Sequence, residues 1–547
     1  MATSVYFNGK QRTLPGVYST ITSGQSSASR SLDYGTVLLI DTGKFGAGFG
    51  GGSGVNGTDK QGKDAVYTFQ TLEDFRNFVK GGMFWKAAEA LWNPDPYNAD
   101  ATGISKLLYA RACTTTPASM TFSPAAGGTL TIKTVDEGLN ANGKLNVDHL
   151  QYGYAYTVEA GEDNPEAVVI KFWRGTYTGD YTDPVTGVVL SYDELTVEQA
   201  EPLLICQTPE CTTLAEVIKW CQTDANFGAR FILDSTSEAG GTDELSATDD
   251  VTDGYELFSG GTEDYKPTDI DDLLKQISDV EYNIVFTDQI EADGDSATVK
   301  KVVTHRNTQA KFDKFVYTAA YADKANYDKS LTMAKGFNSA WCVCVHGGVG
   351  TASDMVASGI RWWGVFYNLC QVIGRVSGKP PYVPVTNKTI GGDKLQHIPT
   401  EKEMENAVKA GLVVVYPNPY LGRFVVLQGI TTLQDNSLLY NKKGESFSIQ
   451  FMRIIAQLNK ECVVNAEIDL LGDENGVNLN TLSKGALETW TINFLQTRVA
   501  TENQDNLIVK FQNVVATRVQ DYYNVTYEVV LNSEITKIFF TGFILSE

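Results

Sequence analysis

The feature that most constrains the fold of this chain is an alternation of short apolar strands with helices that begins near residue 205. Two of these helices start with capping boxes, at 213–216 and 268–271, where a Thr and an acidic side chain satisfy free backbone amides. The apolar, β-branched runs predict strands over 231–233, 283–286 and 340–345. A long aromatic-rich helix is predicted over 353–374. Strands that alternate with helices favour a largely parallel sheet with helical crossovers.

The segment before this alternation is rich in β-branched and alternating residues. It predicts strands over 129–135, 154–158 and 168–173, with Gly and Pro between them, and therefore an inserted β-sandwich. The N-terminal part predicts strands over 36–40 and 106–112, with a glycine loop and a capped helix at 71–74 between them. The last 150 or so residues predict another α+β unit, with strands over 412–416, 424–427, 430–433, 507–511, 524–531 and 535–540 and helices over 447–457 and 481–495.

The fold class predicted from these patterns is a multidomain α/β and α+β protein. The expected division is an N-terminal arm (1–30), the N-terminal part of the core (31–118), a β-rich sandwich-like domain (119–204), an α/β domain (205–398), a C-terminal α+β domain (399–523) and a C-terminal strand or arm (524–547). The 547 residues are enough for several domains of ordinary size.

The charge balance excludes two classes of partner. With 44 basic and 66 acidic residues the net charge is −22, so we expect no nucleic acid and no membrane surface as a partner, since both need clustered Lys and Arg. The N-terminus has no apolar signal-peptide region, and no apolar run approaches the ~20 residues of a membrane span. The eight cysteines lack the spacing of a disulfide framework, so we expect reduced thiols in a cytosolic product.

Two stretches of the sequence resemble nucleotide-binding motifs but lack the residues that such sites need. The glycines from Gly46 to Gly51 fit a dinucleotide fingerprint, but the glycines that follow cannot start the helix that the pyrophosphate needs. The stretch from Gly57 to Asp64 nearly spells a P-loop, with Asp64 where Mg²⁺ needs Ser or Thr. We therefore predict no cofactor.

Metal and hydrolase motifs are equally incomplete. Cys342, Cys344 and His346 would share one face of a strand, but no fourth zinc ligand lies nearby in sequence. Asp249 and Asp253 resemble part of a calcium loop that lacks its other ligands. His346 with Ser353 suggests a hydrolase, yet no nucleophile elbow surrounds the serine. We predict no metal and no catalytic residue.

Eight short motifs, in order along nearly the whole chain, resemble the contractile tail sheath family of phages and injection machines. They are PGVY at 15–18, YTFQTLEDF at 67–75, LLYARA at 107–112, LTIKTVDEG at 130–138, FSGGTED at 258–264, GKPPYVP at 378–384, QGITTL at 428–433 and MR at 452–453. The family's Trp and Asn in the proline-rich motif and one of its paired arginines are missing.

The resemblance implies a structural subunit, not an enzyme, with a central domain of subtilisin-like fold. Such a subunit polymerises as helical, hexameric-type rings around a tail tube and contracts to drive the tube through a cell envelope. Its implied partners are further copies of itself, the tube protein, and the baseplate and tail terminator proteins. Its implied location is the tail of a virion assembled in the host cytoplasm.

Terminal arms that add strands to a neighbour's sheet would keep subunits linked while they slide. The candidate inter-subunit arm residues are Pro15, Gly16, Val17, Tyr18, Tyr527, Val529, Ile538 and Phe540. For the C-terminal strand, pairing within its own domain is an equal alternative. Two other functions stay open: another ring-forming tail or baseplate protein, and an α/β hydrolase-like or nucleotide-binding enzyme.

Overall fold

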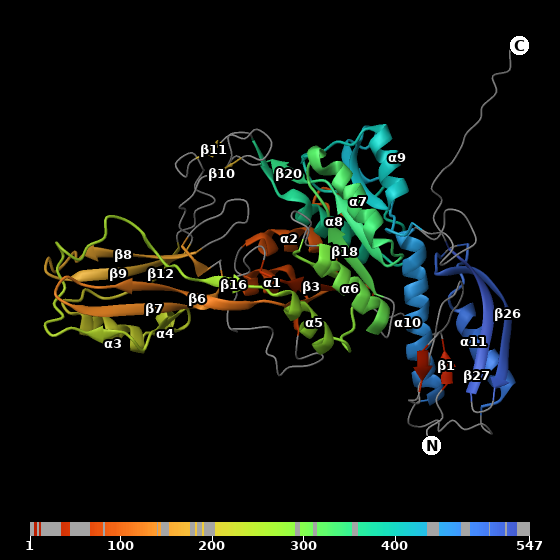
Figure 1. Cartoon of the computed structure of the whole chain (residues 1–547), viewed down its shortest axis with the longest axis horizontal. Helices are drawn as coiled ribbons and strands as arrows, with labels where there is room; N and C mark the ends of the chain where they lie inside the picture. Colours follow the sequence, from red (N-terminus) through yellow and green to blue (C-terminus); the bar gives the residue numbers. More distant parts are fainter. Residues whose placement is uncertain are drawn as a thin grey trace, which may run out of the picture.

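The structure is a computed structural model in which three units follow one another along the long axis (Figure 1). It describes residues 5–7, 10–12, 34–43, 66–79, 82–138, 141–143, 153–174, 181–182, 189–190, 203–289, 296–309, 314–352, 359–434, 448–471, 482–502, 504–519 and 522–532. A β-rich unit occupies one end, an α/β core the middle and a C-terminal unit the other end. None of the described helices has the length and apolar character needed to cross a membrane.

The core is built on a nine-stranded sheet with the order β22-β25-β24-β19-β18-β17-β3-β5-β4. Six adjacent strands are parallel: β3 (Thr36–Asp41), β5 (Lys106–Arg111), β17 (Ile284–Thr287), β18 (Phe315–Ala319), β19 (Cys342–His346) and β24 (Leu412–Asn418). The antiparallel edges are β4 (Tyr67–Phe69), β25 (Arg423–Val426) and β22 (Thr389–Ile390). β3 is the point at which the winding reverses, because β5 follows on one side and β17 on the other.

Helices cover both faces of this sheet, because alternate strand residues point to opposite sides. Val37 and Leu39 of β3 pack in one apolar cluster with α1 (Leu72–Val79), α2 (Gly82–Trp92) and α8 (Gly364–Ser377). Leu38 and Ile40 pack in another with α5 (Pro267–Gln276) and α6 (Ser296–Gln309). On the same sheet, α7 (Tyr327–Phe337) and α9 (Glu401–Ala410) pack against β19 and β24.

The β-rich unit has two antiparallel sheets around one apolar cluster. One sheet contains β6 (Thr114–Phe122), β7 (Gly128–Glu137), β13 (Phe231–Leu233), β14 (Glu238–Ala239) and β16 (Thr262–Asp264). The other contains β8 (Tyr154–Ala160), β9 (Val168–Arg174), β12 (Leu203–Gln207) and β15 (Glu256–Leu257). The helices α3 (Leu214–Thr223) and α4 (Ala225–Gly228) pack against the same cluster.

The packing of this unit corrects the boundary expected at 204/205. Phe231 pairs with Thr134 of β7, and Leu214 and Val217 of α3 lie in the β-rich cluster rather than on the parallel sheet. The chain returns to the core only after β16, whose Asp264 pairs with Thr114 at the start of β6. The β-rich unit is therefore an insertion that leaves and re-enters the core along neighbouring strands.

The C-terminal unit consists of α10 (Ile449–Leu471), α11 (Lys484–Gln496) and the hairpin β26 (Ile508–Val519) and β27 (Tyr522–Leu531). The boundary expected at residue 399 is also corrected, because Leu412 of β24 pairs in parallel with Cys344 of β19 in the core. α10 joins the two units: Met452 and Ile455 pack in the core cluster, and Ile454 and Leu458 pack with the hairpin.

Most local expectations are confirmed, and three are wrong. The capping box at Thr213 forms as predicted, and the Thr71 hydroxyl caps its helix by accepting the amide of Asp74 and donating to the Asp74 carboxylate. The third helix starts earlier than expected, since Pro267 is its first residue and Asp269 accepts the amide of Lys266. The helix predicted from 353 begins at Gly364, after a strand β21 (Ile360–Trp362) that pairs with β20 (Val349–Ala352). Among the described residues, the stretch 430–433 forms a single bridge, from Ile430 to Ser448, in place of the predicted strand.

Three smaller pairings complete the described strands. β20 also pairs with β23 (Lys394–Leu395), and the short strands β1 (Val5–Phe7) and β2 (Lys10–Arg12) pair with each other, as do β10 (Tyr181–Thr182) and β11 (Val189–Leu190). A 3₁₀ turn over Lys324–Asn326 leads into α7.

Candidate assembly interface

The C-terminal hairpin is a two-sided ribbon with one packed face. Phe511 and Val514 of β26 and Tyr527 and Val529 of β27 lie against the apolar cluster of α10 and α11. This cluster includes Leu458 and Phe494. The alternation of half-buried and exposed residues along β27 follows from the two-residue period of a strand. The inner face is what fixes the hairpin to its own domain.

The opposite face of the hairpin is exposed and partly apolar. Large apolar side chains there remain accessible, including Val509 and Val530 at nearly half of their full surface, together with Val515, Val519 and Tyr522. These side chains alternate along the ribbon with the polar pairs Thr517–Asn524 and Gln512–Glu528, so the face offers both apolar and polar contacts. The outer face of this ribbon is therefore a candidate contact surface.

The hairpin also has strand edges. β26 and β27 form a two-stranded sheet, and among the described residues no further strand pairs with either. The edge of β26 is occupied near its start by a bridge from Val499 to Ile508, and Glu488 accepts the amide of Ala516. Free backbone groups along an edge can accept an added strand from another chain.

The predicted arm residues divide into two groups. Tyr527 and Val529 lie in β27, which pairs with β26 of the same chain. This stretch therefore pairs within its own domain, which is the second of the two alternatives. Pro15, Gly16, Val17, Tyr18, Ile538 and Phe540 lie outside the described residues.

Ser353, which was weighed with His346 as a hydrolase pair and rejected, lies outside the described residues. Nδ1 of His346 lies 2.8 Å from Oγ of Ser330 on α7, and its Nε2 lies 2.8 Å from Nδ1 of His397. Glu403 Oε2 lies 3.5 Å from Nε2 of His397. Sequence reasoning missed Ser330 and His397 as partners, because nothing in the local sequence links α7 to the end of β19.

This Ser330–His346–His397–Glu403 chain is a buried structural network. Ser330 is fully buried and both histidines are nearly so, which leaves no space for a substrate at the hydroxyl. Burial and the neighbouring His397 lower the pKa of His346 to about 3, so its imidazole is neutral. The network ties α7, β19 and α9 together at the carboxyl end of the sheet.

The remaining motifs supply no ligand site within the described residues. The glycine stretches 46–51 and 57–64 lie outside them. Asp249 accepts a hydrogen bond from Ser246, and Asp250 accepts the amides of Ala125 and Ser246. No group of three His, Cys, Asp or Glu side chains in the described part of the chain is placed to hold a metal. All eight cysteines are free thiols, and seven are buried.

No protein-family model and no curated protein matches this sequence. The fold, however, is that of tail sheath proteins. The sheath tail protein of Desulfitobacterium hafniense superposes with a TM-score of 0.55 at 13% identity, over 94% of this chain and 100% of that one. The sheath tail protein of Listeria innocua gives 0.47 at 14% identity, over 93% and 97% of the two chains. The contracted helical sheath of the anti-feeding prophage gives 0.36 at 11%, over 51% and 73%.

The conclusion about the fold rests on the superposition with the Desulfitobacterium hafniense protein. It covers nearly the whole chain, including the inserted β-rich unit and the C-terminal unit. At this identity the likeness establishes the fold alone. The resemblance to the tail sheath family that was seen in the sequence is thus confirmed at the level of the fold.

Proposed function

We propose that this chain is the structural subunit of a contractile tail sheath. The observation that carries the proposal is the shared fold with a sheath tail protein over 94% of the chain and the whole of its counterpart. The eight ordered motifs in the sequence point to the same family independently of the coordinates. The subunit would polymerise as helical rings around a tail tube, and contraction of the rings would drive the tube through a cell envelope.

The proposal extends to fold details, partners and location. The parallel core corresponds to the subtilisin-like domain expected from the family, and the two sheets around one cluster to its β-sandwich. The partners are further copies, the tube protein, the baseplate and the tail terminator, and the location is the particle's tail, assembled in a host cytoplasm. The role needs no cofactor and no catalysis, and the burial of Ser330 supports a non-enzymatic function.

We place the inter-subunit contact at the C-terminal hairpin. Its exposed apolar face and its strand edges suit the addition of strands from the arms of neighbouring copies, residues 15–18 and 538–540. In this arrangement Tyr527 and Val529 hold the acceptor hairpin on its own domain, and the arms supply the strands. Main-chain hydrogen bonds of this kind survive rigid-body motion of the bodies they connect.

Negative-stain electron microscopy of the purified protein tests the function. Tubes or stacked rings are the expected result, and a compact monomer that hydrolyses an ester or a nucleotide would contradict it. Deleting residues 1–18 should abolish tubes while the monomer keeps its circular dichroism. Normal tubes from that variant would overturn the arm proposal but leave the sheath function standing. Because hundreds of copies with charge −22 repel one another, tube formation should also depend on salt.

A further inference from the structure

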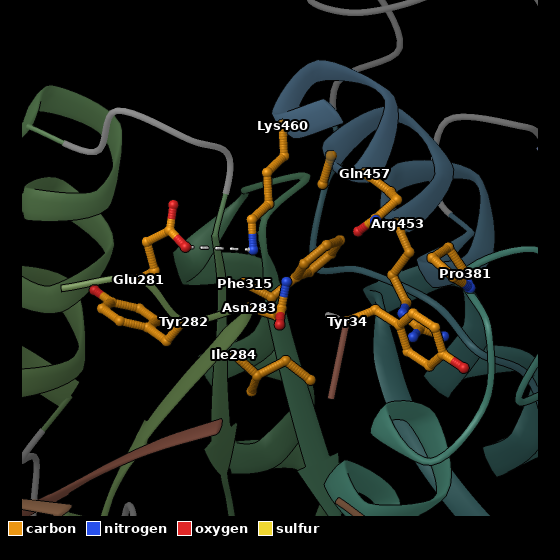
Figure 2. Close-up of a pocket in the computed structure, with 11 residues that line it drawn as sticks. Tyr34, Glu281, Tyr282, Asn283, Ile284, Phe315, Pro381, Arg453, Gln457 and Lys460 are labelled. Atoms are coloured by element: carbon orange, nitrogen blue, oxygen red, sulfur yellow. Dashed lines mark ion pairs between the residues drawn. The ribbon is translucent and has the colours of Figure 1, made fainter. Parts of the chain in front are cut away.

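A small cavity lies where the core meets the C-terminal unit (Figure 2). One wall is made by the amino-terminal ends of three parallel strands, with Tyr34 before β3, Asn283 before β17 and Phe315 at the start of β18. The other wall is α10, from which Arg453 and Lys460 extend. The cavity measures about 30 Å³, which is room for about two waters or one small anionic group.

Arg453 is a buried cation without an acidic partner. It is 7% exposed, and its Nη2 donates to the carbonyl oxygen of Lys379 at 2.9 Å. No carboxylate in the described part of the chain lies within ion-pair distance of its guanidinium. Burial lowers the pKa of Arg453 to about 10, which still leaves it charged at neutral pH. A buried charge without a counter-ion is costly, so an opposite charge in this cavity would be stabilised.

Two further donors surround the same space. Nζ of Lys460 lies 4.0 Å from Oε2 of Glu281, the single acid among the described residues that line the cavity, and the side chain of Glu281 is mostly exposed. The Oδ1 atom of Asn283 accepts the amide of Thr36, which leaves the Nδ2 group of Asn283 as a donor on this wall. Just behind, Lys314 donates to the carbonyl of Val280 and lies 3.9 Å over the ring of Tyr282. Among the described residues, Arg453 and Lys460 thus line the cavity with one exposed acid, and Lys314 lies behind them near Glu281 and Asp279.

We propose that this cavity is an oxyanion-binding site, in which Arg453, Lys460 and Asn283 hold a carboxylate or phosphate group. A guanidinium, an ammonium and an amide N–H are the donors that such groups prefer. The site lies at the amino-terminal ends of the parallel strands, away from the buried histidine network, and does not depend on the proposed sheath function. The anion would come either from solution or from an acidic side chain of another copy.

Inorganic phosphate is the probe for the test, added to dilute, unassembled protein in place of chloride at matched ionic strength. The wild type should show a saturable rise in melting temperature of roughly 2 °C, as expected for a ligand that binds the folded state alone. Arg453→Met should lose the saturable part and keep the gradual stabilisation that phosphate gives any protein. Lys409→Gln, which removes an exposed lysine of α9, should behave as the wild type.

An equal, non-saturating rise in the wild type and in Arg453→Met would overturn the proposal. If Arg453→Met does not fold cooperatively, Lys460→Gln takes its place, with the same two outcomes. Sedimentation velocity of the same samples separates the two sources. Phosphate that weakens self-association of the wild type but not of Arg453→Met identifies the anion as a carboxylate of another copy. Saturable binding without that effect identifies a free anion.

Discussion

The Nε2 atom of His346 lies 2.8 Å from the Nδ1 atom of His397, so the two buried rings share a hydrogen bond in which one donates and the other accepts. Protonation of both rings would put an N–H on each facing nitrogen, which breaks this bond and places two cations side by side. Burial lowers the pKa of both histidines, and that of His346 to about 3. The network therefore holds together in its neutral form.

The first prediction follows from this neutral network. The unfolded state takes up a proton on His346 near pH 6.5, whereas the folded state does so near pH 3, so stability falls as the pH falls between these values. The loss is on the order of 3–5 kcal/mol across the window. Urea unfolding at pH 7 and pH 4.5 measures the part of the loss that falls above pH 4.5, about 2–3 kcal/mol. His346→Gln should show a shallower loss, and an identical pH dependence in both proteins would contradict the assignment.

The second prediction concerns Lys314, whose pKa burial lowers to about 8. Between pH 8 and 10.5 the unfolded chain holds the proton and the folded chain does not, so this group makes stability rise with pH. The contribution is on the order of 3 kcal/mol. Cysteines and tyrosines titrate in the same range, so the measurement is the difference between the wild type and Lys314→Met from pH 7.5 to 9.5. Lys275→Met, at an exposed lysine, should leave the wild-type slope unchanged.

The third prediction concerns the buried ion pair between Arg498 and Glu461, whose Nε and Oε2 atoms lie 2.6 Å apart. It links α10 to the segment after α11. Arg498→Met should destabilise the protein by about 3–5 kcal/mol, because it leaves a buried carboxylate without its cation. The double variant Arg498→Met, Glu461→Met should recover most of this loss. Chemical denaturation of the single and double variants checks both values, and additive losses would refute the coupling.

The fourth prediction concerns the inserted β-rich unit. Asp264 pairs with Thr114, so the two ends of the insertion are neighbours, and the apolar cluster of the unit has no member in the core clusters. Replacing 115–263 by a short Gly-Ser linker should leave a core that still unfolds cooperatively, because a short linker spans adjacent strands at little entropic cost. Thermal melting followed by circular dichroism measures this. A core that no longer melts cooperatively would show that the insertion stabilises it.

The sequence was informative where structure is local. The capping residues Thr71 and Thr213 and the β-branched runs predict helices and strands correctly, since these signals act within a few residues. Strand pairing is not local: nothing in Phe231–Leu233 says that it joins β7 rather than the parallel sheet. The domain boundaries expected at 204/205 and at 399 therefore lay in the wrong places.

The candidate sites also depend on contacts between residues that are far apart in the sequence. Arg453 stood out as part of a family motif, but its lack of an acidic partner depends on strand ends that lie 140 to 420 residues away in sequence, as with Phe315 and Tyr34. The hydroxyl partner of His346 is on α7, which meets the end of β19 only through the packing of the fold. The arm residues follow from the resemblance to the tail sheath family. The hairpin to which we propose that they bind is known only from the structure.

The reversal of winding at β3 has a consequence for synthesis on the ribosome. One neighbour of β3, β5, emerges soon after it, but the other, β17, pairs across about 250 residues, since Val37 lies opposite Ile284. At a translation rate of roughly 5–20 residues per second, one edge of this apolar strand stays unpaired for on the order of 12–50 s before β17 is synthesised. The whole β-rich insertion is translated within that interval. It has time to fold on its own before the core can close, and the nascent chain needs protection at β3 until then.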